Sequence, residues 1–399
     1  MRVLHVIPAV APRYGGPSMA VVPMCKALTK SDVETLVVAT NADGEGRLNV
    51  PLGERTMWHG IPAIFFERNF SESFKYSADL AYWLRRHVTE FDIVHLHAVL
   101  SHACLAAASV CRGSRVPLVV RPLGTLAPWS LRQKPLRKRV LLALGGRTMV
   151  LTAGAVHCTS AEERRGIEQT FPGARPVVIP LGIDEEYLTA PEPDWADRNR
   201  DRYVLSISRL HPKKNLEALI EAFLGVASQQ RERWRLVIAG DGDPRYVEQL
   251  RQKAGQAATD GRVSFAGWVD GTRKRELLQR ASVFTLASFH ENFGVSVLEA
   301  LASGVPAIVS ASVDLADEIR QANAGWVVEP RVESIAQALS DALEHAEARA
   351  ARATAAQQIA RRFSWPDIAS ELVNLYRGLV AGRSPVGDPI LSSAAPAGR

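Results

Sequence analysis

The segment with the clearest chemical content is TLASFHENFGVSVLEALASGVPAIVS, residues 285–310. Its apolar start predicts a strand, ENFG predicts a loop, and the following residues predict a helix that stops at Gly304. Backbone N–H groups at the first turn of a helix attract anions, so the oxygens of a diphosphate suit this position. The candidate donor-binding residues here are Asn292, Phe293, Gly294, Val295 and Glu299, and Glu291 is a candidate catalytic residue.

Two carboxylates in this segment, Glu291 and Glu299, can face one ligand at two points. A carboxylate accepts hydrogen bonds from hydroxyls, and a sugar nucleotide offers hydroxyls on its hexose and on its ribose. Glu299 stands between Leu298 and Ala300 in an otherwise apolar helix. A charge in such a place needs a partner, so we prefer a binding role to a position on the helix surface.

Two cations, Arg209 and Lys214, follow a predicted strand in SRLHPKKN, residues 208–215, with Asn215 placed to cap the next helix. Cations beside a cleft can neutralise a departing diphosphate, whereas the plain alternative is an ordinary basic loop. Charge on a leaving group grows toward the transition state, so both cations are candidate catalytic residues. With two fixed cations at the leaving group, stabilisation without a metal ion is expected.

Gly15 and Gly16 lie in the loop that follows the first predicted strand. Without a Cβ atom the backbone can approach a phosphate or a sugar closely there, although a plain turn uses the same residues. His97 ends another predicted strand, FDIVHLH, and His95 points to the same face. Histidines at strand ends are often satisfied core groups, so the residues by themselves leave the role of His97 open.

Both halves of the chain alternate short β-branched runs with helical patterns. This alternation predicts two α/β domains with mostly parallel sheets, whose ligands bind outside the carboxyl ends of the strands. EEYLTAPEPDWADRNRD predicts a linker, and FSWPDIASELVNLYRGLVAG predicts a packed C-terminal helix. The predicted parts are an N-terminal acceptor-binding domain over 1–185, a linker over 186–200, a C-terminal nucleotide-sugar-binding domain over 201–363, a helix over 364–382 and a disordered tail over 383–399.

Composition excludes several classes of protein. Of the 399 residues 47% are hydrophobic and 23% are charged, which disfavours a disordered chain or a membrane bundle. The four cysteines form no C-x-x-C pair, which leaves a zinc site or a disulfide framework unsupported and favours a reducing compartment. The start, MRVLHVIPAV, is too short for a signal sequence and is interpreted as a buried strand. No predicted strand is followed by a dinucleotide-binding glycine motif or by a P-loop.

Positive charge gathers in the N-terminal half, which carries 22 Lys and Arg against 13 Asp and Glu through Pro180. Much of this excess lies in SLRQKPLRKRVLLALGGR, next to an apolar run. Such a segment suits an anionic surface such as a membrane or a lipid diphosphate, and a solvated helix face is an equally good interpretation. The cations in question are Arg132, Lys134, Arg137, Lys138, Arg139 and Arg147.

The pattern ENFGVSVLEALASGVP, with two glutamates around an NFG loop, resembles the signature of the retaining family 4 glycosyltransferases. Further matches follow in family order: YGGP, VIPLGID, SRLHPKKNLEALIEAF, IAGDG and AGWVDGTRKRELLQRASVF. DIVHLHAVLSH and RPLGTLAPWSLRQKPLRK are similar to a branch that builds exopolysaccharides or other cell-surface glycans. The resemblance implies the α/β GT-B fold, in which two Rossmann-like domains with parallel sheets face a central cleft and the C-terminal helix packs back on the N-terminal domain.

The resemblance also implies roles for individual residues. In the family, the residues that match Arg209 and Lys214 hold the donor phosphates, and a histidine that matches His97 hydrogen-bonds the transferred sugar. Positions that match Val269 and Lys274 contact the nucleobase and its flanking groups. The co-substrate is then a UDP- or GDP-sugar, and neither a further cofactor nor a metal ion is required.

The expected activity is retaining transfer of a hexose-type sugar to a hydroxyl of a glycan or a lipid-linked acceptor, in the synthesis of cell-surface polysaccharide or glycolipid. Such an enzyme is expected in the cytoplasm, in peripheral contact with an anionic membrane and without a nucleic-acid partner. A sugar-nucleotide epimerase or phosphorylase of the same fold, and a non-catalytic binding protein, are the alternatives. The occupied motif positions favour transfer.

Overall fold

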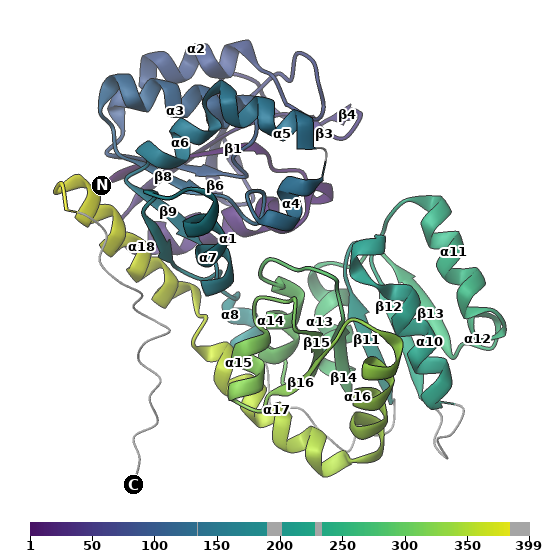
Figure 1. Cartoon of the computed structure of the whole chain (residues 1–399). Coiled ribbons are helices and arrows are strands. Elements are labelled where there is room, and N and C mark those ends of the chain that lie inside the picture. The colour runs from purple at the N-terminus through teal and green to yellow at the C-terminus, as the bar shows by residue number, and fades with distance from the viewer. Residues whose placement is uncertain (134, 190–201, 228–233, 384–399) are drawn as a thin grey trace, which may run out of the picture. The chain divides into compact units, whose positions relative to one another are not determined.

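The structure is a computed structural model that describes residues 1–133, 135–189, 202–227 and 234–383. It divides into two compact units (Figure 1). The first contains Met1–Gly182 and the segment that begins at Trp365, and the second is Ile183–Ser364. Among the described residues, no helix combines the length and the apolar character that crossing a membrane requires.

The predicted linker over 186–200 is described only at its start. There the helix α8 (Glu185–Leu188) belongs to the second unit. Residues 190–200, and the part of the predicted tail from residue 384 on, lie outside the described residues.

An eight-stranded sheet forms the centre of the first unit, in the order β10-β9-β8-β7-β1-β2-β6-β5. Neighbouring strands are parallel except for β5 and β6, which form an antiparallel pair. The central strands are buried and mainly apolar, as expected for strands that are covered on both faces, but His5, His95, His97 and Arg121 interrupt their apolar runs. The strands are β1 (Arg2–Ala9), β2 (Glu34–Thr40), β5 (Arg55–Trp58), β6 (Ile61–Phe66), β7 (Ile93–His97), β8 (Leu118–Arg121), β9 (Ala155–Cys158) and β10 (Pro176–Val178), with a separate hairpin of β3 (Ala42–Asp43) and β4 (Gly46–Arg47).

Helices cover both faces of this sheet. One core cluster contains side chains of α1 and α18, and another contains side chains of α2, α3, α6 and α7. These helices are α1 (Gly16–Lys30), α2 (Ala78–His87), α3 (His102–Ser114), α6 (Arg147–Thr152), α7 (Ala161–Thr170) and α18 (Trp365–Val380).

The C-terminal helix α18 completes the first unit by packing against α1 (Figure 1). Its buried side chains include Ile368, Leu372, Tyr376 and Leu379, which recur at the spacing of one helix face. Each such side chain contributes about 1.5–3 kcal/mol when it leaves water. The prediction that the C-terminal helix packs back on the N-terminal domain is confirmed.

The second unit has a six-stranded parallel sheet in the order β13-β12-β11-β14-β15-β16. Its core includes side chains of α10, α11 and α16. The strands are β11 (Tyr203–Ile207), β12 (Arg235–Ala239), β13 (Val263–Gly267), β14 (Val283–Leu286), β15 (Ala307–Ser310) and β16 (Gly325–Val328). The helices are α10 (Leu216–Ala227), α11 (Pro244–Ala254), α12 (Gln256–Thr259), α13 (Gly271–Arg280), α14 (Val295–Ala302), α15 (Ala316–Gln321), α16 (Val332–Glu344) and α17 (Ala346–Arg361).

In each sheet the strand order reverses between two neighbours that are far apart in the sequence. These neighbours are β1 and β7 in the first unit, and β11 and β14 in the second. Ligands of open parallel sheets bind outside the carboxyl ends of the strands at such a position. Each unit therefore has one place where a ligand is expected.

Gly240, in the IAGDG sequence after β12, supports the loop that follows β11. Its φ is +135°, and a Cβ atom there would lie 1.8 Å from the carbonyl oxygen of Ser208. The N–H of Ser208 donates to the carbonyl of Ala239 at 3.1 Å. The backbone next to Arg209 can therefore reach its position only beside a residue without a side chain.

We expect Gly240→Ala to lower the free energy of unfolding by about 1–3 kcal/mol, because strained φ and a backbone clash coincide there. The loss would be measured by urea denaturation followed by circular dichroism. Gly261→Ala is the matched control, since Gly261 also has a positive φ, +78°, but no atom lies within 4 Å of the place that its Cβ would take. Equal losses in the two variants would contradict the importance of the contact with Ser208.

Candidate active site

Two predicted site residues meet where the strand order of the second sheet reverses. Lys214 ends the 3-10 turn Pro212–Lys214 after β11, and Glu291 follows β14. The Lys214 ammonium donates a hydrogen bond to Glu291 Oε2. Their side chains are only 13% and 19% exposed, respectively, so the ion pair is largely withdrawn from water.

Backbone contacts hold the two loops that carry this pair. The N–H of Phe289 donates to the carbonyl of Lys213 at 3.0 Å, which ties one loop to the other. Buried Asn215 has a φ of +57°, and its side-chain amide donates to the carbonyls of Ala287 at 3.2 Å and Pro330 at 3.0 Å. Asn215 stands directly before α10, and its carbonyl accepts from the N–H of Leu219 at 3.3 Å, which agrees with the expected place at the start of that helix. Its side-chain amide also ties this loop to the segments that follow β14 and β16.

The surroundings of Glu291 favour its charged form. Burial acts to raise its pKa, but the Lys214 ammonium, assisted by Lys213 and His290, lowers that pKa below the usual value. Glu291 is therefore an anion at neutral pH. It can accept hydrogen bonds from hydroxyls and orient a lysine, but it is not a proton donor.

The loop after Glu291 leads into α14 through a rigid turn. Gly294 has a φ of +83°, and a Cβ atom there would lie 3.3 Å from side-chain atoms of Val297 and Val313. Phe293 is buried and packs edge-on against Phe363, with ring centroids 6.0 Å apart. The N-terminal N–H groups of α14 are thus held in place, and Asn292 and Val295 are partly exposed on either side of the turn.

Lys274 and Glu299 form a second ion pair in the same unit. Lys274 Nζ, on α13, donates to Glu299 Oε1, on α14, at 2.6 Å. Glu299 is buried, which agrees with the argument that its charge needs a partner, although that partner is a lysine of the chain itself. Burial raises the pKa of Glu299 despite Lys274, and the nearby Asp184 raises it further. Val269, just before α13, is also buried.

Arg209 differs from the other predicted residues of this unit because its side chain is exposed. It lies in the loop after β11. In this loop the N–H of Leu210 donates to the carbonyl of Asp241, after β12, at 2.8 Å. Within the described part of the chain, no hydrogen bond joins Arg209 to Lys214 or Glu291. Arg209 thus lies near the end of β11 with an exposed guanidinium, and its role at the diphosphate stays a prediction.

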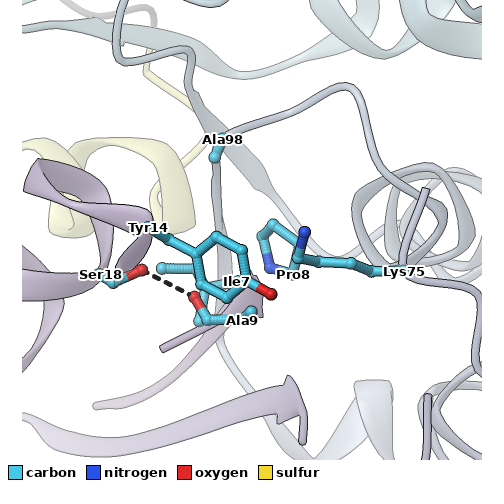
Figure 2. Close-up of a pocket in the computed structure, with 7 residues that line it drawn as sticks. All are labelled: Ile7, Pro8, Ala9, Tyr14, Ser18, Lys75 and Ala98. Carbon is cyan, nitrogen blue, oxygen red and sulfur yellow. Dashed lines mark hydrogen bonds between the residues drawn. The ribbon is translucent and has the colours of Figure 1, made fainter. Parts of the chain in front are cut away.

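The first unit has a pocket of about 160 Å³ at its own point of strand reversal. It is lined by the end of β1, by Ala98 after β7, and by Tyr14, Ser18 and Lys75 (Figure 2). Gly15, with φ +76°, and Gly16 follow Tyr14, and no atom lies within 4 Å of a Cβ position at either residue. The space beside both glycines is open, as a binding role requires.

Lys75 and Tyr14 are pocket residues that sequence reasoning missed. Tyr14 Oη donates to Glu72 at 2.6 Å and accepts from the N–H of Gly44 at 2.8 Å. Lys75 Nζ lies 3.1 Å from Glu72 and 4.2 Å from the centre of the Tyr14 ring. Tyr14 directly precedes the glycine pair, which is a usable signal, but Lys75 stands in a loop without any motif.

His97 is fully buried, in a row of polar side chains that crosses four strands. His157 Nε2 donates to the carbonyl of Ile179 at 2.7 Å, so in a neutral ring its Nδ1 accepts from His95 Nε2 at 3.3 Å. His95 Nδ1 then accepts from the hydroxyl of Tyr376 at 2.7 Å. This chain of contacts fixes the tautomers of both histidines and ties α18 to the sheet.

The other end of the row is incompletely bonded. His97 Nε2 lies 3.1 Å from His5 Nδ1, while His97 Nδ1, His5 Nε2, and Nε and Nη2 of the buried Arg121 have no partner among the residues that the structure describes. The free ring nitrogen of His97 is therefore Nδ1. Sequence reasoning also missed His5 and Arg121. Each is a polar residue in an otherwise apolar predicted strand, RVLHVIPA or VPLVVR, and this pattern could have identified them.

Ring nitrogens of His5, His95 and His97 lie within 4.8 Å of one another, a spacing that a metal ion could use. The surroundings do not fit a cation. Both nitrogens of His95 are already hydrogen-bonded, and the Arg121 guanidinium is close enough to lower the pKa of each of the three rings. We therefore assign no metal to this cluster.

The sequence matches known families over most of its length. Residues 14–187 match Glycosyltransferase Family 4, and residues 192–359 match Glycosyl transferases group 1. An uncharacterized glycosyltransferase of Methanocaldococcus jannaschii is 33% identical over 180 residues, 44% of this chain and 45% of that protein. The GDP-mannose:cellobiosyl-diphosphopolyprenol alpha-mannosyltransferase of Komagataeibacter xylinus is 23% identical over 96% of this chain and 95% of that protein.

Two further comparisons extend this result. The GDP-mannose-dependent alpha-(1-6)-phosphatidylinositol monomannoside mannosyltransferase of Mycobacterium tuberculosis is 28% identical over 75% of this chain and 80% of that protein. The Anabaena protein HepE, solved in complex with UDP and glucose, has a TM-score of 0.75 at 22% identity and covers 95% of this chain and 100% of that chain. The likeness confirms the predicted GT-B fold class, with two domains built on parallel sheets.

The buried histidines make the stability of the fold depend on pH. Burial, and then Arg121, lowers the pKa of His5 and of His157 to about 3. An unfolded histidine has a pKa near 6.5, so protons bind the unfolded chain more tightly than the folded one. Stability is therefore complete above about pH 6.5 and falls toward pH 3, by up to about 1.4 kcal/mol per pH unit for each such histidine.

Urea denaturation at several pH values between 7.5 and 5 would measure this slope. His157→Gln should reduce the slope, whereas His59→Gln, a change at an exposed histidine, should leave it unchanged. An unfolding free energy that stays constant across this range would contradict the assignment of neutral buried rings.

Proposed function

The chain belongs to glycosyltransferase family 4, and we propose that it is a retaining enzyme that transfers a hexose-type sugar from a nucleotide-diphosphate sugar to an acceptor hydroxyl. The observation that carries the proposal is the contact between Lys214 and Glu291 where the strand order of the second sheet reverses. A cation held there can receive the oxygens of a leaving diphosphate, and α14 begins only four residues after Glu291.

The second unit is proposed to bind the donor. Lys214 and Arg209 contact the diphosphate, and the backbone N–H groups from Asn292 to Val295 add donors at the start of α14. Glu291 accepts hydrogen bonds from hydroxyls of the transferred sugar while it holds Lys214. The Lys274–Glu299 pair, with Val269 beside α13, is assigned to the ribose and the base, because a buried carboxylate can accept from ribose hydroxyls.

The first unit is proposed to hold the acceptor and to contact the transferred sugar. Gly15 and Gly16 leave open space for a close approach to the backbone. His97 has a free Nδ1 atom and a pKa far below neutrality, because it is buried beside Arg121. It therefore acts as a neutral hydrogen-bonding group that positions the sugar, not as a base that removes a proton.

In the proposed reaction, the bond between the anomeric carbon and the diphosphate oxygen breaks as the acceptor oxygen attacks from the same side. The proton of the acceptor hydroxyl passes to the departing phosphate oxygen, so atoms and charges balance without a protein nucleophile. The diphosphate gains negative charge during this step. Lys214 and Arg209 stabilise that charge, and they lower the barrier to the extent that they bind the transition state better than the donor.

The relatives guide the choice of donor and acceptor. One relative is named for GDP-mannose and a diphosphopolyprenol-linked sugar, another for GDP-mannose and a phosphatidylinositol mannoside, and HepE was solved with UDP and glucose. We therefore propose a UDP- or GDP-sugar as donor and a glycan or a lipid-linked sugar as acceptor. The activity then belongs to polysaccharide or glycolipid synthesis at a membrane surface.

We expect Lys214→Ala to lower kcat by a factor on the order of 100 or more, because it removes charge stabilisation that grows in the transition state. The variant also leaves Glu291 without its cation, so the double change Lys214→Ala with Glu291→Gln should recover stability without recovering kcat. Lys253→Ala is the control, since Lys253 pairs with Glu221 on exposed helix surfaces. Turnover at the wild-type rate in Lys214→Ala would disprove the role in diphosphate binding.

Transfer should continue in excess EDTA, because fixed cations take the place of a metal ion at the diphosphate. Proton NMR of the first product formed should show the anomeric configuration of the donor. Complete loss of turnover in EDTA that only Mg²⁺ or Mn²⁺ restores would contradict metal independence. An inverted product would contradict the same-side mechanism while leaving the family assignment intact.

A further inference from the structure

The first unit carries an exposed surface that combines apolar and cationic side chains. It lies on α4 (Pro128–Arg132), α5 (Pro135–Leu141), the π-helical turn Leu142–Gly146 and the start of α6. Leu136, Val140 and Leu144 are 75%, 55% and 73% exposed, and their four-residue spacing suits one side of a helix. We call this surface the basic apolar face, and its residues are Arg132, Leu136, Arg139, Val140, Leu144 and Arg147.

The concentration of exposed apolar side chains here is unusual for this protein. Eleven large apolar side chains are exposed among the described residues, and three of them fall within nine consecutive positions. Leu136 and Leu144 are the two most exposed of the eleven. Scattered exposed leucines need no explanation, but a cluster rimmed by charged residues marks an interaction site.

The charge of the surrounding sequence selects the kind of partner. Residues 93–161 contain no Asp or Glu but nine Lys or Arg. Arg132, Arg139 and Arg147 are exposed, which leaves their guanidinium groups accessible to an anionic surface.

The other cations of the segment contribute differently. Arg137 donates to the carbonyl of Ser73, and Lys138 donates to Ser130. The expectation that Arg137 and Lys138 face a membrane is therefore replaced by a structural role for both. Lys134, which the same expectation included, lies outside the described residues.

We propose that the basic apolar face docks on the surface of an anionic lipid bilayer. The arginines pair with lipid phosphates, and the three apolar side chains enter the boundary between headgroups and acyl chains. A nucleic acid would use the cations but would leave the leucines exposed to water. The inference rests on the proposed function in one respect: a lipid-linked acceptor is anchored in a bilayer, so an enzyme that uses it acts at the bilayer surface.

The same face is connected to the pocket of the first unit. The Arg137 guanidinium on α5 holds the carbonyl of Ser73, in the loop that also carries Lys75. Lys75 lines the pocket beside Tyr14 (Figure 2). Docking through α5 therefore fixes the element that supports one wall of the pocket, which would place the pocket near lipid headgroups.

Co-sedimentation tests this proposal with phosphatidylcholine vesicles that contain or lack phosphatidylglycerol, at low and high salt. The full-length protein should bind the anionic vesicles, and high salt should weaken the binding. Leu136→Ser with Leu144→Ser, and separately Arg132→Gln with Arg139→Gln, should each lower the partition coefficient roughly tenfold or more, since one surface cation accounts for about a fivefold change.

Two controls change the same residue types elsewhere in the first unit. Arg85→Gln with Arg86→Gln removes an exposed basic pair of α2, and Met57→Ser removes an exposed apolar side chain of β5, so both should bind like the wild type. Donor hydrolysis, measured without vesicles, should be the same in all of these variants. The docking proposal would be overturned if the wild type did not bind anionic vesicles, or if both double variants bound them as well as the wild type does. A wild type that binds vesicles but does not hydrolyse a donor would count against the proposed function alone.

Discussion

The Lys214–Glu291 ion pair is the interaction on which the candidate site depends. Each residue comes from a loop after a different strand, and the pair is mostly shielded from water. Removing one partner of such a pair leaves a charge without compensation, which costs about 3–5 kcal/mol where burial is complete. The pair therefore fixes the ends of β11 and β14 relative to each other, and Asn215 reinforces the same junction through neutral hydrogen bonds.

The polar row in the first unit solves a similar problem without opposite charges. His95, His157 and Tyr376 satisfy one another and a backbone carbonyl, so each ring can stay neutral in the interior. The incomplete end of the row lies at His97, the last residue of β7. A buried polar group without a hydrogen-bond partner lowers the free energy of unfolding. These groups lie where a ligand is expected to bind, at the carboxyl ends of the strands, which is a reason for the protein to retain them.

Sequence reasoning predicted the features that depend on local pattern. The α/β alternation, the packed C-terminal helix and the loop before α14 all follow from residues that are neighbours in the chain. The contact of Lys214 with Glu291 could not be derived in this way, because it requires the order of strands in the sheet. Lys75 was missed for a related reason, since its place beside Tyr14 results from tertiary packing and not from a motif.

The two buried glutamates show how similar residues acquire different properties. Glu291 and Glu299 each contact one lysine, and burial disfavours the charge of both. The pKa of Glu291 is nevertheless lowered, because Lys213 and His290 add positive potential to that of Lys214. The pKa of Glu299 is raised, because burial outweighs the effect of its single lysine, Lys274, and Asp184 adds to that of burial. At the predicted diphosphate position, Glu291 stays ionised and the neighbouring cations outnumber it. The site assigned to the nucleoside carries less net charge. This difference matches the charge distribution of a sugar nucleotide.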